Sequence, residues 1–324
     1  MSDQVKTIGV LTSGGDAPGM NAAIRAVVRA GYARGMKVMG IERGYAGLLN
    51  EEIREMRPQD VSNIIERGGT ILLTARCKEF MEEAGQKKGA EICRKYGIDG
   101  IVVIGGDGSY QGAIKLSENG VNTIGIPGTI DLDIACTEYT IGFDTAVNTA
   151  MEAIDRLRDT SSSHERCSIV EVMGRHAGHI AIWAGLSTGA EDILMPEDFD
   201  GNIDRIVEHV KESRRLKKTH HLIINAEGNK NSQELADRIE AETGISTRAT
   251  ILGHIQRGGS PTCRDRVTAT LMGVKAVDLL KEGKTNRAVC MQDGRIIDMD
   301  LGEALAMQKS IDPELLNARA LLKR

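Results

Sequence analysis

Short runs of apolar residues alternate along the chain with segments in which apolar residues recur every three or four positions. The runs are typical of buried strands, and the recurrence is typical of amphipathic helices. The runs predict strands at residues 7–13, 37–42, 70–75, 100–106, 122–128, 168–173, 192–196, 221–227 and 247–253. The spaced segments predict helices at residues 21–33, 87–97, 110–120, 146–159, 179–187, 202–216, 232–244 and 265–283.

This order of elements indicates an α/β protein with mostly parallel sheets flanked by helices. The length of 324 residues is enough for one large α/β domain or for two smaller ones. The 37 glycines gather at the ends of the predicted strands, where open α/β sheets bind their ligands. We therefore expect a two-lobed protein with a ligand cleft.

Composition and charge narrow the possible partners. Aromatic residues make up only 3% of the chain, which argues against a surface that stacks nucleic-acid bases. The formal net charge is −5 and the basic residues are scattered, so any anion site must be local. The start MSDQ lacks the apolar stretch of a signal peptide, and no segment approaches a membrane span. We expect a cytoplasmic protein that binds neither nucleic acid nor membrane.

Cysteine and histidine spacing does not indicate a zinc site. The six cysteines are far apart and form no CxxC pair, which favours reduced thiols over disulfides. His176 and His179 form an HxxH pair, but zinc needs further ligands that the neighbouring sequence does not supply. We interpret these two histidines as polar residues at the start of a helix.

Two glycine-rich turns each follow a predicted strand and lead into a predicted helix: LTSGGDAPGMN at residues 11–21 and VVIGGDGSYQGA at residues 102–113. Glycines let backbone N–H groups converge on an anion without interference from Cβ atoms. The second turn contains Asp107, which would repel a phosphate unless a divalent cation lay between them, so Asp107 is a candidate Mg²⁺ ligand. For this turn alone, an ordinary helix N-cap explains Asp107 equally well.

The same turn also permits a different hypothesis. Gly106, Gly108 and Gly112 have a spacing close to the dinucleotide-binding motif, and Asp131 lies about where an acid binds the ribose. Without a cation beside it, the Asp107 carboxylate within the turn would repel the pyrophosphate of a dinucleotide. A dinucleotide-dependent oxidoreductase nevertheless stays open as an alternative from another enzyme class.

Arginines supply a second indication of phosphorylated ligands. In an acidic protein, arginines near strand ends clamp anions through bidentate bonds more often than arginines on helix faces do. Their number here suggests two phosphate groups, one on each reactant. The arginines at or near predicted strand ends or loop starts are Arg76, Arg166, Arg175, Arg248 and Arg257.

The stretch PGTIDLDIA at residues 127–135 places Asp131 and Asp133 one residue apart after a predicted strand. The two acids either carry out chemistry or merely solvate a loop. If the segment is extended, they point to opposite sides, so only one of them needs to face a reacting hydroxyl.

Eight motifs then occur in a fixed order: GVLTSGGDAPGMNAAIR, RGGTILLTAR, VVIGGDGSYQGA, PGTIDLDI, TIGFDTA, EVMGRHAGHIA, NAEG and LGHIQRGGSP. Together they closely resemble the bacterial ATP-dependent 6-phosphofructokinases, from about Lys6 to beyond Leu301. The resemblance implies a two-domain phosphofructokinase-like subunit with its active site in the interdomain cleft, a homotetramer, and phosphorylation of fructose 6-phosphate by MgATP. It also implies an ATP-binding domain at residues 1–142 plus 256–306, and a fructose-6-phosphate-binding domain at residues 143–255 plus 307–324.

The resemblance further implies roles for the residues at matching positions. Asp131 would be the base that takes the proton of the sugar hydroxyl, Asp133 would support the base or the metal, and Asp107 would bind Mg²⁺. The implied catalytic set is Asp131, Asp133, Thr129 and Arg175. The implied contacts to ATP are Gly15, Arg76, Cys77, Gly106, Asp107, Gly108 and Ser109. The implied contacts to the sugar phosphate are Thr129, Asp131, Met173, Gly174, Arg175, Glu227, His254 and Arg257, with Arg166 and Arg248 reaching in from a neighbouring subunit.

Two small residues indicate which phosphoryl donor the protein uses. Related enzymes that use pyrophosphate tend to carry Asp and Lys where this chain has Gly108 and Gly128. A small residue at 108 leaves space for the α-phosphate and the nucleoside, whereas Asp would fill that space and repel the phosphate. The resemblance therefore implies ATP as the donor.

A second anion site is implied for regulation by ADP or phosphoenolpyruvate. Arg25 and Arg29 lie four residues apart and share a helix face, which disfavours the helix by a few tenths of a kcal/mol unless an anion or acid lies between them. On spacing alone, an ordinary solvated basic face explains them as well. The positions that match the family's allosteric site at a subunit interface are Arg25, Arg29, Arg158, Gly189, Glu191 and Lys218.

Two positions depart from the family pattern. Leu132 stands where the family has Asn between the two acids, and Ala135 replaces a usual Pro. Loss of the amide removes a hydrogen bond that would orient the loop, at a cost of about 1–3 kcal/mol if the partner stays buried and unpaired. The departure motivates a third hypothesis, a regulator that binds nucleotide or sugar phosphate without turning it over.

Overall fold

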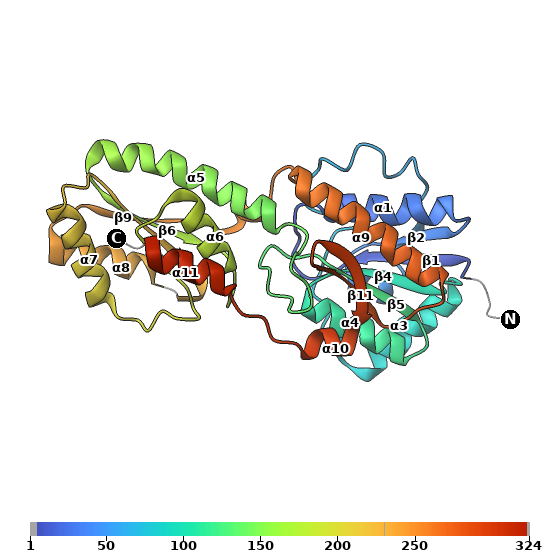
Figure 1. Ribbon diagram of the computed structural model, residues 1–324. Coiled ribbons are helices and arrows are strands. Elements are labelled where there is room, and N and C mark those ends of the chain that lie inside the picture. Colours follow the sequence, from blue (N-terminus) through green and yellow to red (C-terminus); the bar gives the residue numbers. More distant parts are fainter. Residues whose placement is uncertain (1–4, 230, 323–324) are drawn as a thin grey trace. The chain divides into compact units, whose positions relative to one another are not determined.

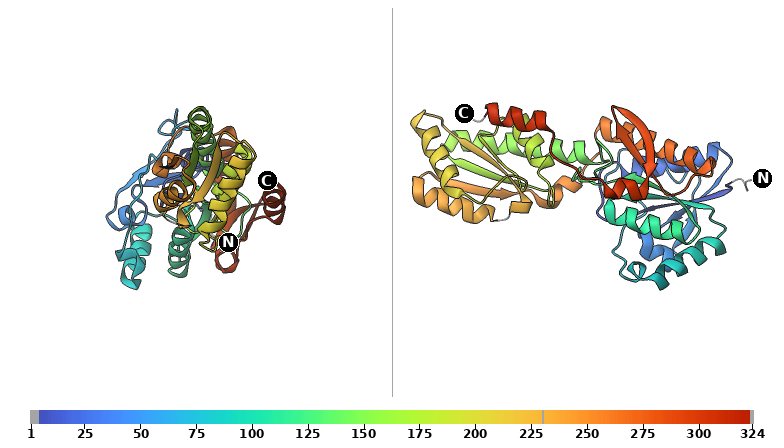
Figure 2. Two further views of the ribbon diagram at one scale, coloured as in Figure 1. Left: turned by 90° about the vertical axis from the view of Figure 1, so that its left-hand side faces the viewer. Right: turned by 60° about the horizontal axis from the view of Figure 1, so that its bottom comes forward.

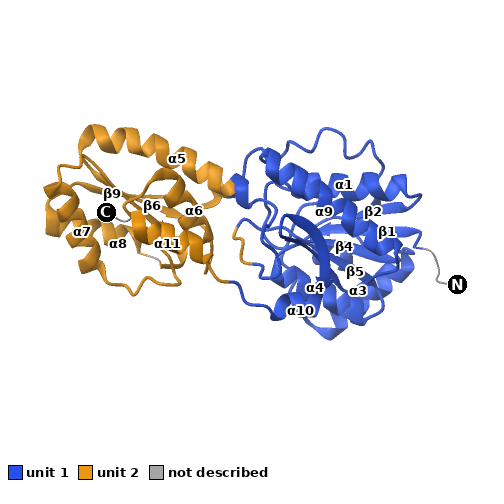
Figure 3. Cartoon of the chain, viewed as in Figure 1, with its two compact units in different colours: residues 1–130, 134–145, 257–309 blue, residues 131–133, 146–256, 310–324 orange. Residues whose placement is uncertain are grey.

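The computed structural model describes residues 5–229 and 231–322. The outermost residues of the two expected domains, 1–4 and 323–324, lie outside this description. The chain forms two compact units, and each is built from three separate stretches of sequence (Figure 3). Unit 1 comprises Met1–Ile130, Ile134–Thr145 and Arg257–Lys309, and unit 2 comprises Asp131–Asp133, Ala146–Gln256 and Ser310–Arg324.

Unit 1 is built on a seven-stranded sheet with the order β11-β10-β5-β4-β1-β2-β3. The five central strands are parallel, and the two edge strands β3 and β11 are antiparallel to their neighbours. The strands are β1 (Thr7–Thr12), β2 (Lys37–Ile41), β3 (Ile53–Glu55), β4 (Gly100–Gly105), β5 (Asn122–Pro127), β10 (Arg287–Gln292) and β11 (Arg295–Asp300).

Helices cover both faces of this sheet, with α1 and α9 on one face and α3, α4 and α10 on the other (Figures 1 and 2). All residues of β4 are buried, as expected for a parallel strand covered on both sides. The helices of unit 1 are α1 (Met20–Ala33), α2 (Gly44–Leu49), α3 (Glu83–Lys95), α4 (Asp107–Glu118), α9 (Cys263–Lys281) and α10 (Leu301–Ala306), with a short 3₁₀ turn, η1 (Glu79–Met81).

Unit 2 has a four-stranded, fully parallel sheet with the order β7-β8-β6-β9. Helices α7 and α8 bury Ile206, Val210, Leu235 and Ile239 against the strands, which gives this unit its own core. The strands are β6 (Cys167–Val172), β7 (Asp192–Leu194), β8 (His221–Ala226) and β9 (Thr247–Ile251). The helices are α5 (Phe143–His164), α6 (His179–Thr188), α7 (Ile203–Arg215), α8 (Ser232–Thr243) and α11 (Pro313–Leu322), with 3₁₀ turns η2 (Glu227–Asn229) and η3 (Gly253–Arg257).

The predicted α/β class, with mostly parallel sheets flanked by helices, is confirmed. The predicted strand at residues 70–75 is wrong, because this segment forms turns and irregular backbone. The sequence analysis also missed the β10–β11 hairpin, whose turn Asp293–Gly294 has positive φ at both residues and is a common hairpin signal. The other elements it missed are β3, α2, α10 and α11.

Within residues 5–229 and 231–322, every helix is too short or too polar to cross a membrane. All six cysteines are free thiols.

Within unit 1, a buried carboxylate joins the start of α9 to the segment that ends with Thr145, in the first turn of α5. Asp265, in the first turn of α9, accepts hydrogen bonds from Tyr139 Oη (2.5 Å), Gly142 N (2.7 Å) and Thr145 N (2.9 Å). The Thr145 hydroxyl donates a further short hydrogen bond to it. Burial is the largest influence on Asp265 and raises its pKa above the ordinary value, while the bonds from Thr145 and Tyr139 lower it. The unit 1 residues Gly142 and Thr145 are thereby held against the first turn of α9.

We expect Asp265→Ala to lower the free energy of unfolding by at least about 3 kcal/mol, because several buried donors lose their acceptor. Asp278→Ala is the control, since this carboxylate forms a half-exposed ion pair with Arg34 and its loss should cost about 1 kcal/mol or less. Urea denaturation followed by circular dichroism measures both. Equal losses in the two variants would contradict the structural role of Asp265.

Candidate active site

The turns that follow β1 and β4 touch each other at the carboxyl edge of the unit 1 sheet. Ser13 N donates to Ile104 O at 3.0 Å. A Cβ atom on Gly105 would lie 2.4 Å from both Ser13 O and Ser109 Oγ, so no side chain fits at position 105. The two predicted phosphate-binding turns therefore meet backbone to backbone.

The second turn leads directly into α4. Its N-cap is Gly106 and its first helical residue is Asp107, so the alternative explanation of Asp107 as the N-cap is wrong. Asp107 is exposed, whereas Ser109 is buried. Cβ atoms on Gly106 and Gly108 would meet no atom within 4 Å. The start of α4 thus combines an exposed carboxylate with open space on both sides.

The segment wrongly predicted as a strand brings Arg76 and Cys77 to this same edge. Thr74 Oγ1 donates to Gly14 O at 2.7 Å, and Thr12 Oγ1 donates to Leu73 O at 2.8 Å. These bonds hold the segment across the ends of the strands instead of within the sheet. Arg76 is exposed and Cys77 packs against the core.

Arg257, which was assigned to the sugar phosphate, lies against the first turn within unit 1. Its Nη1 atom donates to Asp16 O at 3.2 Å. A Cβ atom on Gly15 would lie 2.3 Å from the same Nη1, so the close approach of the guanidinium depends on glycine at position 15.

The loop after β5 carries the paired acids. Gly128 N donates to Gly105 O at 3.1 Å, which keeps the start of the loop beside β4. Thr129 is half-buried in unit 1, while Asp131 is buried and is grouped with unit 2. Between the acids, Leu132 has φ +56°, a left-handed conformation that Asn tolerates far better than Leu. The family's Asn therefore fits the backbone here, a reason that the sequence analysis did not find.

The predicted sugar-phosphate residues of unit 2 meet at the carboxyl edge of its sheet. Arg175 N donates to Glu227 Oε1 at 2.7 Å, across the ends of the adjacent strands β6 and β8. Gly174 and Arg175 both have positive φ, which makes a tight turn. Met173 N donates to the side chain of Gln256 at 3.4 Å. Gln256 lies in η3, the turn that also carries the exposed His254.

Arg166 and Arg248 lie at the opposite edge of this sheet. Arg166 directly precedes β6, and Arg248 pairs with Ser168 near the amino end of β6. The Arg248 guanidinium forms an ion pair with Glu240 at 2.8 Å. Because a strand of this length spans about 20 Å, one subunit does not bring these two arginines to the Arg175 turn.

Four of the predicted effector residues gather in unit 2. Glu191 Oε1 lies 3.5 Å from Lys218 Nζ, and Arg158 donates a short hydrogen bond to the carbonyl of Thr188, the neighbour of Gly189. Gly189 and Glu191 line a cavity of about 510 Å³ that Arg205 and Arg319 also line. The other two, Arg25 and Arg29, lie on α1 in unit 1, where Arg25 is half-buried and Arg29 is exposed.

Glycine-lined turns at the carboxyl edge of one parallel sheet and the exposed Arg175 at the carboxyl edge of another define an α/β protein suited to phosphorylated ligands. The model of the family described as Phosphofructokinase matches residues 7–280. The chain belongs to the phosphofructokinase family.

Relatives with assigned names match over nearly the whole chain. An ATP-dependent 6-phosphofructokinase from Clostridium botulinum (strain Hall) is 58% identical over 320 residues, which covers 99% of this chain and 100% of that protein. The structure of phosphofructokinase from Saccharomyces cerevisiae has a TM-score of 0.88 and 35% identity, and the match covers 98% of this chain but only 48% of that chain. A pyrophosphate-dependent phosphofructokinase from Marinobacter aquaeolei shares the fold at a TM-score of 0.86 with 22% identity, covering 98% of this chain and 91% of that chain.

The left-handed backbone at position 132 generates a prediction about stability. We expect Leu132→Asn to be more stable than Leu132→Ala by about 0.5–1 kcal/mol, because both variants lose the leucine side chain but only Asn tolerates positive φ. Thermal unfolding of the two variants side by side measures the difference. Turnover of Leu132→Asn should equal or exceed that of the unmodified protein. An Asn variant that is less stable than the Ala variant would contradict the backbone argument.

Proposed function

We propose that this protein transfers the γ-phosphoryl group of ATP to the 1-hydroxyl of fructose 6-phosphate, giving fructose 1,6-bisphosphate and ADP. The observation that carries the proposal is the presence of two separate places suited to phosphate: the open, glycine-flanked start of α4 in unit 1, and the exposed Arg175 at the carboxyl edge of the unit 2 sheet. Two such places match a reaction between two phosphorylated substrates. The name of the full-length relatives, ATP-dependent 6-phosphofructokinase, supports ATP and fructose 6-phosphate as the substrates, and glycolysis is the proposed pathway.

In the proposed mechanism, Asp131 takes the proton of the attacking hydroxyl, and Thr129 and Asp133 keep the loop and the base in position. Arg175 supplies positive charge as the phosphoryl group moves. Phosphoryl transfer depends on positioning and electrostatic stabilisation more than on covalent chemistry, so a carboxylate base and positioned cations are sufficient groups.

We further propose that Asp107 holds Mg²⁺. The fit rests on its exposed carboxylate at the start of α4, between two glycines that leave open space for phosphates. Bound there, the cation would neutralise charge on the phosphate oxygens. Gly15, Gly106, Gly108, Ser109, Arg76 and Cys77 would surround the rest of the nucleotide.

The space around two glycines supports ATP over pyrophosphate as the donor. A Cβ atom on Gly108 would meet nothing within 4 Å, so the turn has room for an α-phosphate. At Gly128, by contrast, a Cβ atom would lie 3.0 Å from Met20 and 3.1 Å from Ile104. The lysine of related pyrophosphate enzymes would therefore be accommodated at position 128 only if these neighbours moved.

The quaternary and regulatory parts of the proposal rest on residue placement. Arg166 and Arg248 lie at the edge of the unit 2 sheet away from Arg175, so we propose that each subunit lends them to a neighbour within a homotetramer. Met173, Gly174, Glu227, His254 and Arg257 would bind the sugar phosphate. ADP or phosphoenolpyruvate would bind near Glu191, and the cytoplasm is the proposed compartment.

The alternative of a regulator without turnover is less well supported, because Asp107, Asp131 and Asp133 are all retained and the match to named enzymes covers the whole relative. The oxidoreductase alternative is also weakened. Gly112, which completes its motif, packs against Tyr45, where a Cβ atom would lie 2.6 Å from the ring. That glycine has a structural explanation.

A coupled assay for fructose 1,6-bisphosphate tests the function. We expect turnover with ATP, Mg²⁺ and fructose 6-phosphate, little or none when pyrophosphate replaces ATP, and a loss of about 10²–10⁴-fold in turnover for Asp131→Ala with sugar-phosphate binding retained. Ligand binding without turnover in the unmodified protein would favour the regulator.

Efficient turnover with pyrophosphate alone would refute ATP as the proposed donor. Near-normal turnover of Asp131→Ala would refute Asp131 as the proposed base.

Regulation makes a separate prediction. We expect ADP or phosphoenolpyruvate to shift the half-saturating concentration of fructose 6-phosphate more than the turnover, and the double variant Arg25→Ala/Arg29→Ala to abolish that shift. Arg156→Ala is a matched control, because this exposed arginine forms a surface pair with Glu152. Saturation curves that neither ligand moves in the unmodified protein would remove the regulatory proposal and leave the catalytic one intact.

A further inference from the structure

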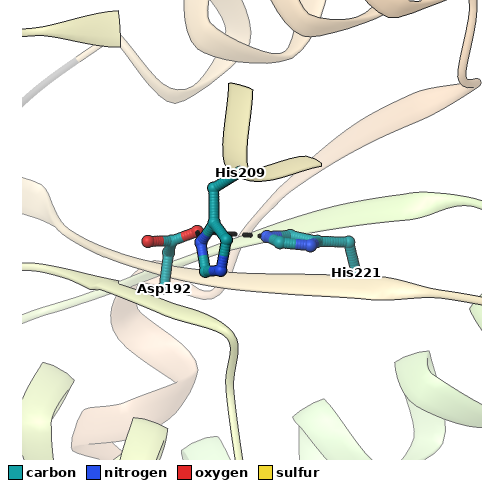
Figure 4. A group of neighbouring side chains, drawn as sticks. All are labelled: Asp192, His209 and His221. Atoms are coloured by element: carbon teal, nitrogen blue, oxygen red, sulfur yellow. Dashed lines mark hydrogen bonds and ion pairs between the residues drawn. The ribbon is translucent and has the colours of Figure 1, made fainter. Parts of the chain in front are cut away.

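Two histidines and an aspartate that are distant in sequence meet in unit 2. Asp192 Oδ2 lies 2.7 Å from His209 Nδ1 and 3.1 Å from His221 Nε2. Figure 4 shows the two imidazole rings converging on this one carboxylate oxygen, and the rings stand nearly perpendicular to each other with centroids 5.3 Å apart. Asp192 begins β7, His221 begins β8, and His209 comes from α7.

The cluster is enclosed but has one accessible member. The side chains of Asp192 and His221 are 1% and 4% exposed, whereas that of His209 is 19% exposed. Among the residues that the structure describes, these three form a group whose ligand atoms all lie within 4.8 Å of one another. A small ion therefore has a route to the cluster along the His209 side.

We propose that Asp192, His209 and His221 bind a divalent transition-metal ion of the Zn²⁺ type. A carboxylate oxygen and two imidazole nitrogens are ligands that such ions prefer, and three protein ligands leave the fourth tetrahedral position to water. Metal–ligand bonds of about 2.0–2.1 Å in a tetrahedron place ligand atoms about 3.3 Å apart. The two carboxylate–imidazole separations of 2.7 and 3.1 Å are close to this value, and all three ligand atoms lie within 4.8 Å of one another, so the side chains must adjust their positions to bind an ion.

A fourth side chain is placed to orient one ligand. Ser213 Oγ lies 2.9 Å from His221 Nδ1, and Ser213 follows His209 by four residues on the same face of α7. When Nε2 of His221 gives its lone pair to the ion, Nδ1 keeps its proton and donates a hydrogen bond to Ser213 Oγ. Hydrogen bonds of this kind fix the tautomer and the ring orientation of metal-binding histidines.

The site is distinct from the groups assigned to catalysis. Asp192 and His221 lie at the amino edge of the unit 2 sheet, and Arg175 and Glu227 lie at its carboxyl edge. A bound ion would tie α7 to β7 and β8, beside Glu191, whose carboxylate accepts from Leu222 N at 2.8 Å. Its expected effect is therefore to stabilise unit 2. Without an ion, the same three side chains would form only a hydrogen-bonded triad, which is the alternative that the experiment must separate.

Titration of the metal-depleted full-length protein with Co²⁺ tests the proposal. We expect about one equivalent per chain with visible absorption of a tetrahedral nitrogen and oxygen site, and no thiolate charge-transfer band. Cys263 is an exposed thiol and thus a competing ligand for the ion, so Cys263→Ser should keep the signal if the proposed site binds it. Absence of the visible band in the unmodified protein would overturn the proposal in favour of the hydrogen-bonded triad.

Variants test whether the visible Co²⁺ band arises from the proposed site. His209→Gln should abolish the visible band, and Ser213→Ala should weaken Co²⁺ affinity by about 10–100-fold. The control His164→Gln changes an exposed histidine of the same unit and should bind normally. Zn²⁺ should raise the unfolding temperature of the unmodified protein and of His164→Gln, but not that of His209→Gln. Undiminished Co²⁺ binding by His209→Gln and Ser213→Ala, each with unchanged circular dichroism, would overturn the assignment.

Discussion

In both units the central strands run parallel, so their carboxyl ends meet at one edge of the sheet and their amino ends at the other. In unit 1 this places the turns after β1, β4 and β5 side by side, and in unit 2 it joins the Arg175 turn to Glu227. The same constraint sends Arg166 and Arg248 to the amino edge. Arg175, Arg166 and Arg248 carry the same charge. They have different proposed roles because Arg175 lies at the carboxyl edge of the unit 2 sheet and the other two lie at its amino edge.

The candidate site of unit 1 also requires neighbouring segments of the chain to lie very close together. Gly105 has no room for a Cβ atom between the turns after β1 and β4, and Gly15 leaves room for the Arg257 guanidinium. Gly108 is different, because its open space is available to a ligand instead of being filled by protein. Glycine therefore serves two purposes at this edge. It lets two turns touch, and it keeps a volume free where the proposed donor phosphates would bind.

Two of the non-glycine residues with a left-handed backbone lie where the chemistry is proposed. Leu132 and Arg175 are non-glycine residues with positive φ, and both belong to segments assigned to catalysis or substrate binding. Such conformations persist only where surrounding contacts hold them, and they gather at functional sites. The apolar side chain of Leu132 is suited to its buried position, but leucine tolerates a left-handed backbone poorly. Its departure from the family pattern therefore concerns the conformation of the loop as well as the hydrogen bond that an Asn side chain would make.

The sequence by itself determined the α/β class, most of the helices and strands, and the two glycine-rich turns, because periodicity and turn residues act over a few neighbouring positions. It misread residues 70–75 as a strand, since an apolar run does not reveal that hydrogen bonds between Thr12, Thr74 and the backbone will hold the segment across the strand ends. Only the tertiary structure decided that Leu132 has a left-handed backbone. It also brought His209 and His221 to Asp192, although they lie 17 and 29 residues away along the chain. Contacts between distant segments depend on how helices pack on sheets, and no local pattern encodes them.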